Sequence, residues 1–128
     1  PGARGYITDA CVPISRLAEA ILETADDLAA SPLIAPLVGH AGDGNFHLAI
    51  MIDPDDPAEM AEAERLGSRI SERAIRLGGT VTGEHGVGLG KRKFMEAEHG
   101  DAWAVMGDIK HTLDPRGILN PGKVVPGN

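Results

Sequence analysis

At the centre of the chain stands Gly39-His40-Ala41-Gly42-Asp43-Gly44-Asn45-Phe46-His47, between two apolar runs at 33–38 and 48–52. Three glycines within nine residues permit a tight reversal of the backbone. The flanking runs have the length of buried strands. The stretch therefore predicts a strand, a tight turn and a second strand. Pro36 lies inside the first run, so we expect that strand to start late or to lie at a sheet edge.

A helix is predicted before this hairpin. A short strand at 7–12 leads to Ser15, which we expect to be the helix N-cap. Leu17, Ile21 and Leu28 then recur at helical spacing, which indicates an amphipathic helix to about residue 30.

A second helix is predicted after the hairpin. Asp56-Pro57-Ala58-Glu59 combines a capping residue, an N1 proline and an N3 glutamate, and Gly78-Gly79 supplies a left-handed stop. One apolar face should be buried, comprising Met60, Ala63, Gly67, Ile70, Ala74 and Leu77. The opposite face should be solvated, comprising Glu64, Arg65, Arg69, Glu72 and Arg73.

The remaining third of the chain contains less regular structure. We expect a short strand at 80–82, a glycine-rich loop at 83–90 and a helix at 101–113 that buries Trp103, Met106, Ile109 and Leu113. The tail at 116–128 has no periodicity. The predicted fold class is α+β: one domain, 1–128, with a two-layer, mainly antiparallel sheet, helices packed on one face and an extended C-terminal tail.

Composition restricts the partners. The net charge of -7 over 128 residues disfavours nucleic acid and anionic membranes, and aromatic residues make up only 3% of the chain. Cys11 is the only cysteine, which excludes an internal disulfide. The sequence shows no leader pattern and no apolar run of membrane length, so we expect a cytoplasmic location. The chain opens with Pro1 and no methionine, which suggests a fragment or a processed product.

Two histidines flank the tight turn. In a hairpin, His40 and His47 should lie on the same face, close enough for both imidazoles to bind one metal ion. The alternative is that both are surface residues beside a turn. Asp43 and Asn45 have an equally simple explanation, because both residue types favour tight turns.

A second group of polar residues lies in the glycine-rich loop, within Gly83-Glu84-His85-Gly86-Val87-Gly88. Glu84 and His85 should point in opposite directions, so one could bind a metal while the other faces a substrate. Two histidines and one carboxylate form a common ligand set for zinc, manganese or iron. The alternative is that Glu84 caps a helix and His85 is solvated.

Taken with Asp114-Pro115-Arg116-Gly117-Ile118-Leu119-Asn120-Pro121-Gly122-Lys123, the two motifs resemble the C-terminal domain of the FAD-linked oxidases. This family includes D-lactate dehydrogenases, the flavin subunit of glycolate oxidase and D-2-hydroxyglutarate dehydrogenase. The opening segment 8–17 is also similar to the family, so the resemblance covers nearly the whole chain.

The resemblance implies that His40, His47 and Glu84 bind a divalent metal, with zinc expected first and manganese or iron as alternatives. It implies that His85 is the general base and that Asn120 contacts the flavin. The substrate would be a small D-2-hydroxy acid, oxidised to the 2-oxo acid. FAD would be bound mainly by an N-terminal domain of the same protein that this chain lacks, so the chain alone is expected to be inactive. The electron acceptor stays open, and so does a homodimer.

Two other functions are compatible with the same residues. A free-standing metal hydrolase would use the metal to activate water, with His85 as proton shuttle. A non-catalytic docking module would carry these histidines and glutamate without using them.

Overall fold

The computed structural model describes residues 2–127, and the chain divides into two compact units, Pro1–Glu84 and His85–Asn128. The first unit contains the sheet and two long helices. The second contains shorter helices and the C-terminal tail. Within residues 2–127, no helix combines the length and the apolar character needed to cross a membrane.

One long strand organises the sheet of the first unit. Strand β4 (Asn45–Ile52) pairs antiparallel with β3 (Leu37–His40), and also with β1 (Arg4–Ile7) and β2 (Ala10–Cys11). β2 and β3 both pair with the first residues of β4, so they lie on opposite sides of it. The predicted antiparallel hairpin and the α+β class are therefore confirmed.

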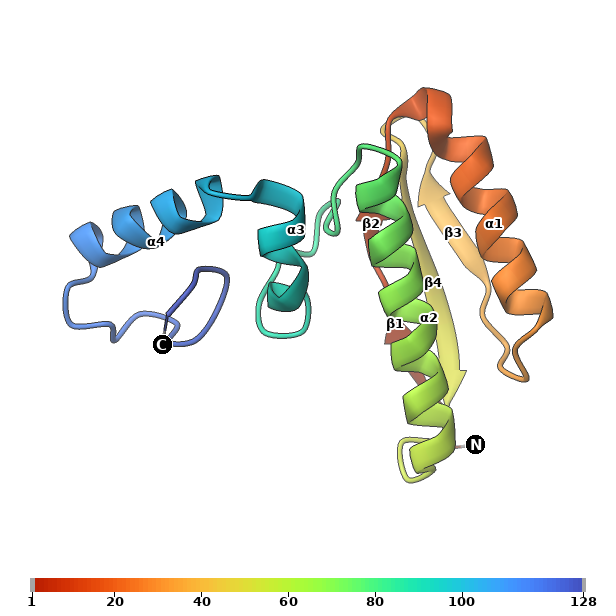
Figure 1. Ribbon diagram of the computed structural model, residues 1–128. Coiled ribbons are helices and arrows are strands. Elements are labelled where there is room, and N and C mark those ends of the chain that lie inside the picture. The colour runs from red at the N-terminus through yellow and green to blue at the C-terminus, as the bar shows by residue number, and fades with distance from the viewer. Residues whose placement is uncertain (1, 128) are drawn as a thin grey trace. The chain divides into compact units, whose positions relative to one another are not determined.

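Both long helices cover the same face of this sheet (Figure 1). Helix α1 (Leu17–Ala29) and helix α2 (Pro57–Arg76) pack against the alternate residues of β4 that point toward them. The β4 residues on this face are all buried: Phe46, Leu48, Ile50 and Ile52. The intervening β4 residues, Asn45, His47, Ala49 and Met51, point to the other face, because side chains alternate along a strand.

The strand predicted at 7–12 is wrong in its bounds. The structure has β1 and β2 with a gap at Thr8 and Asp9, although the same register continues on both sides of the gap. The interruption has a local cause. The Leu48 amide donates to the Thr8 hydroxyl at 2.8 Å, so a side chain replaces the backbone acceptor that a regular ladder would use.

Three other boundaries differ from the prediction. A 3-10 turn, η1 (Ile14–Arg16), precedes α1, so Arg16 rather than Ser15 is the N-cap, and it makes no side-chain cap. β3 begins at Leu37, after the proline that cannot donate to a ladder, although the Pro36 carbonyl still accepts from Ala49. The strand expected at 80–82 is reduced to a single bridge between Thr80 and Cys11.

Helix α2 begins and ends as its sequence predicts. The Asp56 carboxylate accepts from the amides of Ala58 and Glu59, with Pro57 in the first turn. The Glu59 carboxylate accepts from the Asp53 amide instead of closing a capping box with Asp56. Gly78 ends the helix with φ 77°.

The polar face of α2 contains one error of prediction. Arg73 was expected to be solvated, but it is 5% exposed. Its guanidinium donates to Glu23 at 2.9 Å, to the Thr24 hydroxyl at 2.9 Å and to Asp27. All three partners lie on α1, so Arg73 ties the two helices together. Sequence periodicity placed it on the outer face because the position of α1 cannot be read from α2 alone.

We predict that Arg73→Met destabilises the chain by about 1–3 kcal/mol, since it removes a buried cation that donates hydrogen bonds to two carboxylates and a hydroxyl group. Arg65→Met is the matched control, because Arg65 is exposed and pairs with Glu62 within the same helix. It should leave the free energy of unfolding nearly unchanged. Urea denaturation of both variants measures their free energies of unfolding. An equal loss of unfolding free energy in the two variants would contradict a special role for Arg73.

The same network predicts sensitivity to acid. Burial opposes ionisation of Asp27, but hydrogen bonds from Arg69 and Arg73 outweigh it and hold the pKa of Asp27 below the ordinary aspartate value of 3.8. Hydrogen bonds from Arg73 and Arg76 lower the pKa of Glu23 below 4.5. A carboxyl with a depressed folded-state pKa stabilises the fold above its unfolded pKa and loses that contribution as pH falls through the folded pKa.

We therefore expect the free energy of unfolding, from urea titrations at pH 7, 5 and 3, to fall mainly between pH 5 and 3. Arg73→Met should reduce this fall, because it lets the pKa values of Asp27 and Glu23 move toward their ordinary values. An unchanged pH dependence in the variant would show that other carboxyl groups control acid unfolding.

The second unit departs most from expectation. It contains η2 (Arg92–Phe94), a short helix α3 (Met95–His99) that was not predicted, and α4 (Ala102–Leu113). Helix α4 was expected to bury four residues, but none of its residues is buried and Leu113 is 78% exposed. The unit holds no sheet in its described part, so too little chain surrounds the helix to cover its apolar residues.

The tail is not extended. Residues 116–127 run through turns and bends, and their carbonyl groups accept hydrogen bonds from Arg92 and Trp103. Asp114 stabilises the first of these turns, because its carboxylate accepts from the amides of Ile118 and Leu119. Side-chain contacts thus replace the missing periodic structure of this segment.

Candidate metal centre

The turn between β3 and β4 places His40 and His47 on the same face of the sheet, as predicted. His40 pairs with Asn45, and His47 pairs with Val38, so the two histidines are diagonal rather than directly opposed. Their ring centroids are 5.9 Å apart, and the rings are nearly perpendicular. Gly44 makes the turn possible: it has φ 74°, and a Cβ there would lie 2.0 Å from the Val12 carbonyl oxygen.

His47 is the buried member of the pair, with 7% of its surface exposed. Its Nδ1 lies 3.1 Å from the Thr8 carbonyl oxygen. A carbonyl can only accept, so Nδ1 carries the proton and donates it. With Nδ1 as the donor, Nε2 is the nitrogen that can bind a metal, and it faces Glu84 of the glycine-rich loop.

Glu84 completes the cluster from that loop. Its Oε1 lies 3.1 Å from His47 Nε2 and 3.6 Å from His40 Nε2. The loop is held at its base by Asp9, whose Oδ2 accepts from the backbone amides of Gly83 and Glu84 at 2.9 and 3.1 Å. Two segments far apart in the sequence thus bring a carboxylate to the two imidazoles.

The three side chains fit a divalent metal. One ligand atom from each of His40, His47 and Glu84 lies within 4.8 Å of the others. Two atoms that bind one zinc ion at about 2.1 Å with tetrahedral angles are about 3.4 Å apart, and the two carboxylate-to-imidazole distances lie on either side of that value. Two imidazoles and a carboxylate are also the donors that zinc, manganese and iron accept.

Asn45 adds a buried polar atom beside this cluster. Its Oδ1 has no hydrogen-bond partner within residues 2–127. The Asn45 amide lies directly against Gly83, where an added Cβ would come within 2.4 Å of Oδ1. A buried acceptor without a partner is costly unless a water, an ion or a ligand satisfies it. This observation supports a polar occupant next to the three candidate ligands.

Sequence reasoning missed Asp9, Thr8 and the burial of Asn45. Asp9 is 2% exposed and lies in a segment that was predicted as an apolar strand. A carboxylate inside such a segment is the one signal in the sequence that could have identified it, because charged residues are rarely buried without a partner.

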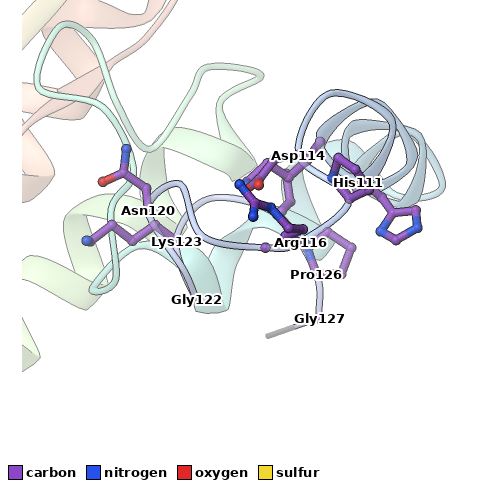
Figure 2. Close-up of a pocket in the computed structure, with 13 residues that line it drawn as sticks. His111, Asp114, Arg116, Asn120, Gly122, Lys123, Pro126 and Gly127 are labelled. Atoms are coloured by element: carbon purple, nitrogen blue, oxygen red, sulfur yellow. The ribbon is translucent and has the colours of Figure 1, made fainter.

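His85 and Asn120 belong to the second unit, and neither is one of the three grouped residues. Both side chains are exposed. Asn120 has φ 46°, a left-handed conformation that asparagine tolerates better than most residues. It lines a pocket of about 320 Å³ together with His111, Arg116 and Lys123, which are labelled in Figure 2. The roles predicted for His85 and Asn120 stay predictions.

The chain is similar in sequence to a known protein family. The family described as FAD linked oxidases, C-terminal domain, matches residues 1–124. The chain belongs to this family. The resemblance inferred from the three motifs is therefore confirmed.

Individual proteins that are similar to this chain carry related names. The chain is 48% identical over 126 residues to "Probable D-lactate dehydrogenase, mitochondrial" of Danio rerio, which covers 98% of the chain and 25% of that relative. It is 50% identical over 127 residues to "D-lactate dehydrogenase [cytochrome], mitochondrial" of Arabidopsis thaliana, covering 98% and 22%. It is 44% identical over 90 residues to "Glycolate oxidase subunit GlcD" of Escherichia coli strain K12, covering 70% and 18%. The chain thus spans about a quarter or less of the length of these relatives.

Proposed function

We propose that this chain is the substrate-side part of an FAD-dependent dehydrogenase that oxidises a D-2-hydroxy acid to the 2-oxo acid. The convergence of His40, His47 and Glu84 is the observation that carries the proposal. Membership of the FAD-linked oxidase family supplies the redox chemistry, since its relatives include proteins named D-lactate dehydrogenase and glycolate oxidase subunit. Substrates of the D-lactate, glycolate and D-2-hydroxyglutarate class are all consistent with the site.

His40, His47 and Glu84 would hold a divalent metal, with zinc first and manganese or iron as alternatives. Held there, the ion would supply a Lewis acid for the oxygen atoms of a 2-hydroxy acid. The protein contributes the orientation of the ligands. Thr8 fixes the His47 ring through its carbonyl, and the turn at Gly44 fixes His40 beside it.

His85 is proposed as the general base. It directly follows Glu84 in the chain, it is exposed, and imidazole is the side chain that most often accepts a proton from a reacting hydroxyl group. Removal of that proton favours departure of a hydride from the adjacent carbon. FAD, held mainly by a flavin-binding domain of the same protein outside this chain, would supply the hydride acceptor.

Asn120 is proposed to contact the flavin. Its support is the left-handed backbone and the pocket that it lines, whose walls also carry the cations Arg116 and Lys123. A homodimer and a separate electron acceptor are compatible with this assignment. The expected cytoplasmic location stays a prediction, and two of the relatives above carry "mitochondrial" in their names.

The first test is metal content. We expect the purified chain, dialysed against Zn²⁺ and then against metal-free buffer, to retain close to one equivalent of zinc by elemental analysis. His40→Ala should retain little, because the variant loses one of three ligands. His111→Ala is the matched control, since this exposed histidine lies in the second unit, and it should behave like the parent. Equal zinc in all three proteins would contradict the proposed centre and favour a docking module.

The second test is catalysis by the full-length protein that contains this chain. We predict that His85→Gln lowers kcat for D-lactate by about 10²–10⁴-fold, the range expected when a general base is removed. Its zinc content should match the parent's, because His85 is not a proposed ligand. A kcat within a few-fold of the parent's, measured across D-lactate, glycolate and D-2-hydroxyglutarate, would exclude His85 as the base.

A further inference from the structure

We propose that Asp9 is a positioning residue of the metal centre, holding the Glu84 backbone and the His47 ring in one arrangement. The inference rests on the proposed metal site and extends it to a residue that does not bind the ion itself. It is carried by three observations: the place of Asp9 in the sheet, its contacts to the loop and its position behind His47.

Asp9 lies where the edge strand is interrupted. The register of β1 and β2 continues through the gap, so Asp9 is opposite His47 on β4 and shares its face of the sheet. The side chain is 1% exposed. Burial of this kind leaves a carboxylate few rotamers, so its two oxygen atoms are fixed in direction.

One carboxylate oxygen holds the loop that carries Glu84. Asp9 Oδ2 accepts from the Thr82 hydroxyl at 3.0 Å, the Gly83 amide at 2.9 Å and the Glu84 amide at 3.1 Å. Charge-assisted hydrogen bonds of this type are about twice as strong as neutral ones. The Glu84 side chain is 49% exposed, so packing does little to fix it. Its backbone is therefore the part that must be held if Oε1 is to stay near both histidines.

The other carboxylate oxygen lies behind His47. Asp9 Oδ1 is 3.5 Å from Nδ1, the nitrogen that donates to the Thr8 carbonyl. A negative charge on this side of the ring makes Nε2 a better electron donor and helps to keep the proton on Nδ1. Asp9 and Glu84 thus place two carboxylates on opposite sides of one imidazole, an arrangement suited to a cation at Nε2.

The experiment compares Zn²⁺ affinity, measured by competition with a chromogenic chelator, in the parent chain and three variants. Asp9→Asn keeps the size and one acceptor oxygen for the loop amides, but it removes the charge and can turn an NH₂ group toward the Nδ1 proton. We expect its affinity to fall about 10–100-fold, the usual effect of losing a partner behind a metal ligand. The Zn²⁺ affinity of Asp9→Ala should fall further, because this variant loses all three hydrogen bonds to the loop.

Ile70→Val is the control for loss of stability. Ile70 is a buried residue of α2 in the hydrophobic core, on the face of the sheet opposite the three candidate ligands. The variant should unfold at lower urea concentration because it loses a buried methylene group, yet its Zn²⁺ affinity should stay within about threefold of the parent's, because no contact of the candidate ligands is removed. Affinity that falls in proportion to stability across Asp9→Asn and Ile70→Val would overturn the positioning role.

Bound Co²⁺ provides a signal that stability alone would not change. Its visible absorption bands depend on the coordination geometry, so we expect them to shift in intensity and position in Asp9→Asn and to stay unchanged in Ile70→Val. A parent chain that binds neither Zn²⁺ nor Co²⁺ would overturn the metal site itself. A parent that binds both, with Asp9→Asn identical to it in affinity and spectrum, would overturn the inference about Asp9 alone.

Discussion

The Leu48 amide lies in the middle of the sheet and needs a hydrogen-bond acceptor. It donates to the Thr8 hydroxyl rather than to a backbone carbonyl. This one exchange interrupts the edge strand without changing its register. It leaves the Thr8 carbonyl available to His47 Nδ1, and it leaves Asp9 opposite His47. The candidate metal centre therefore depends on a gap in the backbone hydrogen bonds between β4 and its neighbouring edge strand. A regular strand at 7–12 would not provide this gap.

The helices on the other face allow this gap to exist. Phe46, Leu48 and Ile50 are fully buried beneath α1 and α2, so β4 stays in place although one of its edges is incomplete. Arg73 adds a polar link between the helices, with Thr24 and two carboxylates as its partners. The hydrophobic core on the helix-covered face stabilises the sheet. The opposite face can therefore carry polar residues, although their removal from water costs free energy.

Local patterns predicted the elements that depend on neighbouring residues. The hairpin around Gly44, the cap at Asp56 and the stop at Gly78 all follow from backbone conformation or from hydrogen bonds over a few residues. Helix α3 was missed because it is only five residues long and has no capping side chain. The burial predicted for α4 failed because periodicity shows which residues share a face, not whether anything covers that face.

The sequence by itself determined the family, and the resemblance to that family implied the three candidate ligands, His40, His47 and Glu84. Only the tertiary structure decided that the Glu84 loop reaches the hairpin, that Asp9 holds it there and that Arg73 is buried. These contacts join residues more than forty positions apart. Their partners are set by how the helices and the sheet pack, and no local pattern encodes that packing.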